Sequence, residues 1–179
     1  SATTGALTIQ NAALADLADS VNLSGAGVSI TATTLNLSGA NASTNTISST
    51  GDANAVSITA SITDTNNPNL TISSQGNVSL AAVTMGTGAF SVTADSNSNG
   101  TNTLAVNGVI NNGGAVTLGG GGTNDTIDIN ASVSATTGAL TIQNAALADL
   151  ADSVNLSGAG VSITATTLNL SGANASTNT

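Results

Sequence analysis

Large aliphatic residues occur along this chain in pairs, and one small or polar residue separates the two members of each pair. The pairs are Leu7/Ile9, Val21/Leu23, Val28/Ile30, Leu35/Leu37, Val56/Ile58, Leu70/Ile72, Val78/Leu80, Phe90/Val92, Leu104/Val106, Val116/Leu118 and Ile127/Ile129. Alternation with a period of two is the pattern of a short β-strand that buries one face. Gly, Asn, Ser and Asp fill the intervening segments, as tight turns require. The sequence therefore predicts an all-β protein.

The strands follow one another too closely for most all-β folds. Val21, Val28 and Leu35 begin pairs that are seven residues apart, whereas antiparallel sandwiches usually space their strands by about 8–12 residues. Short steps of this kind fit a parallel β-solenoid, in which each corner turns the chain by about a third of a revolution. We expect a parallel β-helix with about three short strands per coil of about 22 residues. Tandem β-sandwich repeats with antiparallel pairing are the alternative fold.

The first 46 residues of the chain recur without change at its other end. Residues 1–46 and 134–179 are identical, so the two copies start 133 residues apart. Repetition at a long fixed period is typical of tandem arrays. We therefore divide the chain into one complete unit, residues 1–133, and the first part of the next identical unit, residues 134–179, continuous with the first. An engineered overlap is the alternative explanation.

The strand count within the unit predicts its length along the solenoid axis. When weaker strands near Leu14, Ile47, Ile62, Val83, Val109 and Val133 are included, the unit contains 17 predicted strands. A three-sided coil needs strands in multiples of three, so we expect one more strand within the polar residues 95–101. The unit would then form about six coils and advance about 29 Å at about 4.8 Å per coil.

The composition suits such a solenoid. All nine acidic residues are Asp, there are 20 Gly, and Lys, Arg, His, Cys, Trp and Tyr are absent. Stacked coils place like residues over like residues, so a repeated charge would repel itself, whereas Ser, Thr and Asn can hydrogen-bond in ladders. At the corners we expect Gly and Asn, because both tolerate a positive φ.

The missing residue types exclude several functions. The net charge is −9 with no cationic side chain, so nucleic-acid binding is excluded, because it needs cations that replace the phosphate counterions. Cys/His metal sites and Ser-His-Asp triads cannot form, and we expect the chain not to be an enzyme and to need no cofactor. Apolar runs are only a few residues long, so we expect no insertion into a membrane.

One stretch resembles a calcium-binding nonapeptide of the RTX type. Within residues 119–127, Gly120, Gly121, Asp125 and Ile127 match the nonapeptide, but Thr123 replaces its third glycine. Such sites use stacked copies to complete the oxygen shell around Ca²⁺, and a single copy is present. We therefore expect a glycine-rich corner followed by an ordinary strand. Asp128, between two isoleucines, is expected to point into solvent.

The other paired carboxylates are Asp16 and Asp19, repeated as Asp149 and Asp152. A carboxylate pair that faces a cleft can do acid–base work or hold Ca²⁺. The spacing of the neighbouring apolar residues also fits one protruding helical turn. We expect instead a solvated loop or an irregular strand.

Four phrases carry a resemblance to a known class of protein: GALTIQ, SVNLSGAGVSITATTLNLSG, GNVSLAAVTM and NNGGAVTLGGGG. They resemble the repeats of large secreted bacterial β-helix exoproteins, above all the filamentous-haemagglutinin-like adhesins and related giant surface fibre proteins. The resemblance lies in cadence and composition and covers essentially the whole chain. It implies a right-handed parallel β-helix located outside the cell or on its surface.

Two functions are compatible with these observations. The first is a structural one, a stiff, protease-resistant shaft of an extracellular fibre, giant adhesin or matrix filament, whose partners are neighbouring repeats and lateral shafts. The second is a binding module that recognises a carbohydrate or another surface through its Ser/Thr/Asn faces. An ice-binding threonine array is disfavoured, because the outward positions mix Ser, Asn, Ala and Asp with Thr.

Overall fold

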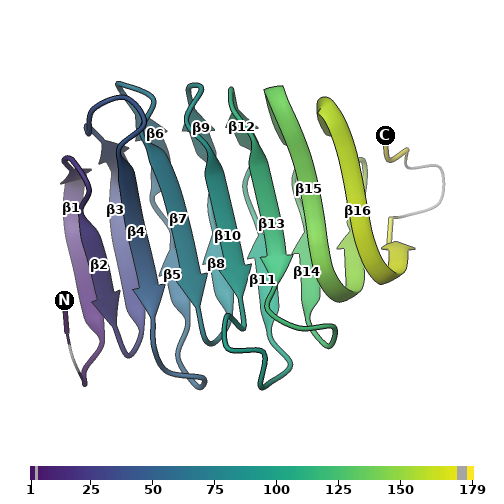
Figure 1. Cartoon of the computed structure of the whole chain (residues 1–179), viewed down its shortest axis with the longest axis horizontal. Helices are drawn as coiled ribbons and strands as arrows, with labels where there is room; N and C mark the ends of the chain where they lie inside the picture. The colour runs from purple at the N-terminus through teal and green to yellow at the C-terminus, as the bar shows by residue number, and fades with distance from the viewer. Residues whose placement is uncertain (3, 173–176) are drawn as a thin grey trace.

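The described chain is one continuous stack of parallel coils (Figure 1). The computed structural model describes residues 1–2, 4–172 and 177–179. These residues form an all-β parallel solenoid of about 7 turns of ~23 residues and contain no helix. Each pair of neighbouring strands in the sheet runs parallel. The predicted β-solenoid is thus confirmed, and the antiparallel sandwich is wrong.

The strands are mostly short, as the paired aliphatics predict. They are β1 (Leu7–Leu17), β2 (Asn22–Gly25), β3 (Val28–Leu37), β4 (Thr44–Ser49), β5 (Val56–Ile58), β6 (Ser61–Asp64), β7 (Asn69–Ser74), β8 (Val78–Leu80), β9 (Val83–Met85), β10 (Phe90–Ala94), β11 (Thr103–Val106), β12 (Ile110–Asn112), β13 (Val116–Gly120), β14 (Thr126–Ile129), β15 (Val133–Leu150) and β16 (Leu156–Leu170). Four strands are longer because each continues around one or two corners and so contributes to more than one face of the solenoid: β1, β3, β15 and β16.

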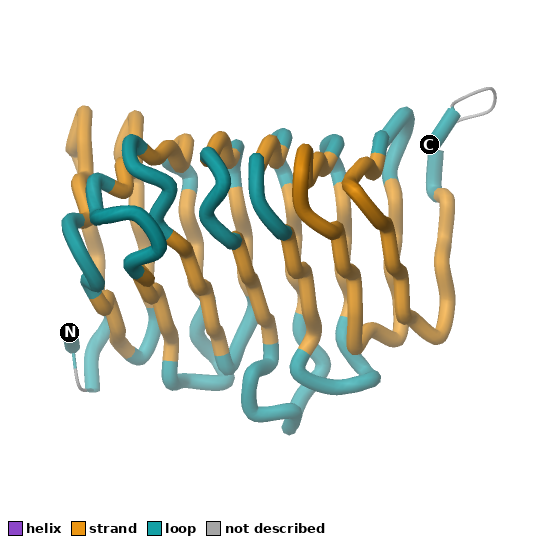
Figure 2. The backbone as a smooth tube through the Cα atoms, turned by 45° about the horizontal axis from the view of Figure 1, so that its top comes forward, coloured by secondary structure: helices purple, strands orange, loops and turns teal. Residues whose placement is uncertain are grey.

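The pairing divides the solenoid into three faces. The first face contains β2, β4, β7, β10, β13, residues 139–143 of β15 and residues 160–163 of β16. The second contains residues 7–10, residues 28–30, β5, β8, β11, β14, residues 147–150 and residues 167–170. The third contains residues 14–17, residues 34–37, β6, β9, β12, residues 133–135 and residues 156–158. The loops gather at the corners between the faces (Figure 2).

Columns of aliphatic side chains fill the interior. On the first face Ile47 is in register with Ile72, and the same column continues through Val92, Leu118 and Ile142. All five side chains are fully buried. Burial of a side chain of this size contributes about 1.5–3 kcal/mol, and each coil obtains it from its two neighbours. The core is therefore a continuous line along the axis.

The unit contains 17 strands, and the predicted eighteenth does not exist. Residues 95–101 form an irregular corner between β10 and β11. Each of the 17 strands predicted from the aliphatic pattern is found, from the segment at Leu7 to the segment at Val133. The unit therefore makes five and two-thirds coils instead of six and advances about 27 Å at ~4.8 Å per coil. The expectation of an eighteenth strand was wrong because a sequence unit need not close a whole turn. Parallel coils join wherever the apolar column continues.

The corners do not use glycine for its backbone freedom, which is a second correction. No described glycine has a positive φ. The residues with a positive φ are Asn11, Ser20, Ala42, Asn67, Asp95, Ser98, Asn144 and Ser153. Several glycines lie instead where the backbones of adjacent coils touch. A Cβ at Gly121 would overlap the carbonyl oxygen of Asp95, and one at Gly88 would overlap that of Pro68. Glycine is needed here because it has no side chain.

Candidate functional surface

The outward side of the first face carries two columns of small polar side chains. One column contains Asn22, Thr46, Thr71, Ser91, Thr117, Thr141 and Ser162, and the other contains Ser24, Ser48, Ser73, Thr93, Gly119 and Gln143. In-register neighbours on adjacent coils are about 4.8 Å apart. Apart from Gly119, these positions therefore present hydroxyl and amide groups, and neither column contains a carboxylate.

The other two faces carry the outward carboxylates. On the second face Asp128 and Asp149 lie in the column that also contains Ser57 and Ser79. On the third face Asp16 lies in register with Asn36. The mixture of outward residue types seen in the sequence is thus sorted by the fold, and the first face contains none of these carboxylates. The sequence did not show this sorting, because it depends on which strands share a face.

Asp128 and Asp149 are direct neighbours on adjacent coils. Their Cα atoms are partners in the pairing of β14 with β15. The Oδ2 atom of Asp128 accepts a hydrogen bond of 3.0 Å from Asn130, and the Oδ1 atom of Asp149 accepts one of 2.9 Å from Asn169. Asp128 thus points outward as predicted, but it faces a like charge across the junction between the first unit and the second.

The glycine-rich corner uses its aspartate as a turn cap. Asp125 is fully buried. Its Oδ1 atom accepts the amide of Asn102 at 2.8 Å, and its Oδ2 atom accepts the amide of Gly122 at 3.0 Å. Both oxygens therefore bind backbone donors, one of them on the preceding coil. The stretch thus comprises the end of β13, a corner at residues 121–125 and β14, which begins at Thr126.

The pair Asp16 and Asp19 is held by polar groups of the next coil. Asp16 lies within β1 and accepts hydrogen bonds from Asn36 Nδ2 at 2.9 Å and from Ser38 Oγ at 3.0 Å. Asp19 lies in the following turn and accepts the amide of Ala40. The helical-turn interpretation is wrong, because residues 14–17 belong to a strand. Asp149 repeats the interaction of Asp16 through Asn169.

A link between corners two coils apart was not visible in the sequence. The Oδ1 and Oδ2 atoms of Asp52 accept hydrogen bonds from Asn97 at 2.6 Å and from Asn99 at 2.9 Å. Donation by Asn99 and then by Asn97 lowers the pKa of the Asp52 carboxyl below its ordinary value. The long corner that replaces the expected strand at residues 95–101 therefore reaches over the short corner at residues 75–77.

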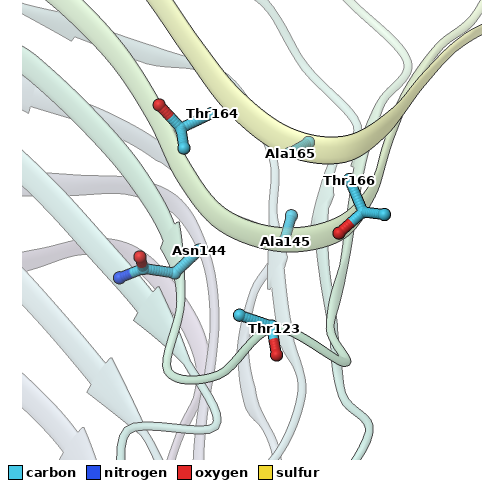
Figure 3. A pocket seen from close by; sticks show the side chains of 6 residues that line it. All are labelled: Thr123, Asn144, Ala145, Thr164, Ala165 and Thr166. Atoms are coloured by element: carbon cyan, nitrogen blue, oxygen red, sulfur yellow. The ribbon is translucent and has the colours of Figure 1, made fainter.

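The corners of three successive coils enclose a shallow hollow (Figure 3). Its volume is about 210 Å³, and it is lined by Thr123, Asn144, Ala145, Thr164, Ala165 and Thr166. Hydroxyl, amide and methyl groups can contact a small neutral ligand, but none of these groups titrates near neutral pH. The residues that line the hollow therefore include no side chain that titrates near neutral pH.

A second hollow of about 330 Å³ lies over the last described coil. Leu150, Leu156, Val161, Ile163, Leu168, Leu170, Asn178 and Thr179 line it. Val161, Leu168 and Leu170 are exposed by 46%, 50% and 60%. The identical residues of the first copy, Val28, Leu35 and Leu37, are exposed by at most 1%, because β5 and β6 cover them. This hollow is the uncovered side of a coil.

Comparison with protein-family models, with curated proteins and with solved structures finds no match to this chain. Within residues 1–2, 4–172 and 177–179, no three His, Cys, Asp or Glu side chains are grouped as metal ligands would be. The same part of the chain contains no helix that is long and apolar enough to span a bilayer.

Proposed function

We propose that this chain is the repeat region of an extracellular bacterial fibre or giant adhesin, in which it forms a stiff β-solenoid shaft. The observation that supports this most is the unbroken pairing between the first unit and the second. Val116 of β13 is in register with Leu140, which is in register with Val161. On the second face Ile127 is in register with Ala148, and Ala148 with Leu168. Because the core crosses the unit boundary, further units would lengthen one shaft instead of adding separate beads.

The surface chemistry also supports a shaft. The chain contains no Lys or Arg, so trypsin has no site at which to cut it. Among the described residues, the strands along the body of the solenoid are paired on both sides, and open sheet edges lie only at its two ends. Within the shaft the partners are neighbouring repeats of the same chain. Two such negatively charged shafts lying side by side would repel each other least where their first faces meet, because the outward columns of this face contain no carboxylate.

Fibre diffraction or cryo-EM of a chain with several units tests the proposal. We expect a meridional spacing of about 4.8 Å from coils stacked along the axis. A string of compact particles without that spacing would overturn the shaft. Resistance to trypsin alone would not decide the question, because an unfolded chain without Lys and Arg also resists. Digestion with thermolysin, which cleaves at exposed aliphatic residues, therefore distinguishes the folded shaft from an unfolded chain.

A binding module is the second candidate, and the two polar columns of the first face favour it. Neutral carbohydrates offer hydroxyl groups that can pair with Thr and Ser. If the first face binds a neutral glycan, Thr71→Asp and Thr117→Asp should each weaken binding on a glycan array. The matched control is Ser79→Asp on the second face, which adds the same charge away from these columns. Equal binding by all three variants would contradict this second function.

A further inference from the structure

The two identical copies of residues 1–46 occupy different faces of the solenoid. Leu7 and Val28 pair on the second face, whereas the same residues of the second copy, Leu140 and Val161, pair on the first. Leu35 lies on the third face, but its copy Leu168 lies on the second. All of these residues have moved by one face in the same direction.

The local structure of the two copies is nevertheless the same. Asn11 and its copy Asn144 have φ values of 58° and 56°, and Ser20 and its copy Ser153 have values of 52° and 57°. A part-buried hydrogen bond recurs as well. Asn45 Oδ1 accepts the amide of Val21 at 2.9 Å, and the equivalent Asn178 Oδ1 accepts the amide of Val154 at 2.7 Å. At these positions the copies differ in orientation and not in local conformation.

The strand count explains the shift. Seventeen strands on three faces make one strand fewer than six whole coils, so the second unit starts on the face before the one on which the first unit started. The last residues follow this rule. Thr46 belongs to the first face, whereas its copy Thr179 pairs with Val154 and Leu156, at the third face.

We propose that successive 133-residue units in a tandem array are each rotated by one third of a turn about the shaft axis. This inference rests on the proposed shaft function and specifies its geometry. The surface then repeats after three units, which contain 17 coils and extend for about 82 Å at ~4.8 Å per coil. The gradual twist of stacked strands adds to this rotation and is common to any solenoid.

The rotation determines where the carboxylate-free columns point. In the first unit they lie on the first face, through Thr46, Thr71, Ser91 and Thr117. The same residues of the next unit would lie on the third face, and those of the unit after it on the second. These residues of three successive units therefore lie on three sides of the shaft. A neighbouring copy of this chain would meet them from a different direction at each unit.

Spin-label distances in a chain of three units test the rotation. The chain contains no Cys, so Thr117→Cys placed in two consecutive units introduces the only labels. Rotation by a third of a turn predicts a distance clearly longer than the unit rise of about 27 Å, because the labels lie on different sides of the shaft. The control pair Thr71→Cys and Thr117→Cys within one unit lies in one column, two coils apart, and should show the short axial separation.

Cryo-EM of the same chain separates the outcomes. A rise of about 27 Å with about 120° of rotation per unit is expected from 17 strands. A rise of about 29 Å without rotation, with labels on one side, would overturn the inference and leave the shaft intact. Compact beads without the spacing of the coils would overturn the proposed function itself, and the inference with it.

Discussion

Gly119 and Gly121 lie two residues apart at the end of β13, yet their surroundings differ. A Cβ at Gly119 would be 3.7 Å from Gln143 Cγ, which is ordinary van der Waals contact. A Cβ at Gly121 would overlap the carbonyl group of Asp95 on the coil before. Backbone atoms at a corner cannot move aside as the end of a long side chain can, so the overlap at Gly121 would not be relieved. The two glycines are therefore a matched pair for testing how closely the coils approach each other.

We therefore expect Gly121→Ala to destabilise the solenoid by about 1–3 kcal/mol, the usual cost of forcing an extra methyl group into a close-packed site. Gly119→Ala should change the free energy of unfolding by less than about 0.5 kcal/mol. Urea denaturation followed by circular dichroism measures both. Equal effects of the two substitutions would contradict the close approach of the corners.

The carboxyl of Asp52 provides a pH-dependent contact. Its pKa is lowered in the folded state, first by Asn99 and then by Asn97. A pKa that is lower in the folded than in the unfolded chain adds stability above the unfolded value, and that stability is lost as the pH falls through the folded value. Asn99→Ala should raise the pKa of Asp52 towards its ordinary value. Asn130→Ala, which removes a donor from Asp128 instead, is the control. NMR titration of the Asp52 carboxyl carbon measures its pKa in each variant. An unchanged pKa of Asp52 in the Asn99→Ala variant would contradict the contact.

At the scale of strands, the pairing of β14 with β15 brings Asp128 and Asp149 together. Like charges directly opposite each other on paired strands destabilise a sheet by roughly 0.2–1 kcal/mol. We expect Asp128→Asn to raise the free energy of unfolding at low salt, because the repulsion is removed and the amide oxygen still accepts from Asn130. At 1 M salt the gain should disappear, because the Debye length falls to about 3 Å.

Asp16→Asn is the control for this charge change. Asp16 lies beside Asn36, which donates to it, and not beside another carboxylate. The substitution removes one negative charge, as Asp128→Asn does, but it also weakens a charge-assisted hydrogen bond. We expect no gain in stability from it. If both variants were stabilised equally, net charge and not the stacked pair would be the cause.

The strands could be predicted from the sequence because each buried pair of aliphatics marks one strand. Val78 and Leu80, for example, are the ends of β8. The partners of each strand could not be predicted in the same way, because the coils differ in length. Ser57 follows its in-register neighbour Ser29 by 28 residues, whereas Asp149 follows Asp128 by 21. No single period therefore identifies which polar residues stack.

Polar residues inside the solenoid were also beyond prediction. Asn45 lies between two threonines, and its pattern does not differ from that of the outward positions. In the structure it is fully buried in the column of Leu70 and Phe90, and its Oδ1 atom accepts the amide of Val21. The residue acts as a cap for a backbone group of the preceding coil, and only the register reveals that group.

At the scale of the molecule, stability should grow with the number of coils. Val161, Leu168 and Leu170 are exposed over the last coil, whereas the same residues of the first copy are covered. Adding residues 47–133 of the unit after Thr179 should bury them, at about 1.5–3 kcal/mol for each side chain fully covered. Hydrogen exchange should then slow in residues 161–170. A Gly/Ser tail of equal length is the control, and equal protection by both extensions would contradict a growing core.

The 17 strands of the unit have a consequence for inheritance. Identical tandem copies in a gene recombine readily, and each event would add or remove one whole unit without breaking the apolar columns. Such a change would alter the reach of the fibre and would also turn everything beyond the altered point by a third of a revolution. We expect natural variants that differ by three copies to present their distal parts in the same direction. Variants that differ by one or two copies should present their distal parts in other directions. The number of copies would then determine both the length of the fibre and the direction that its distal part faces.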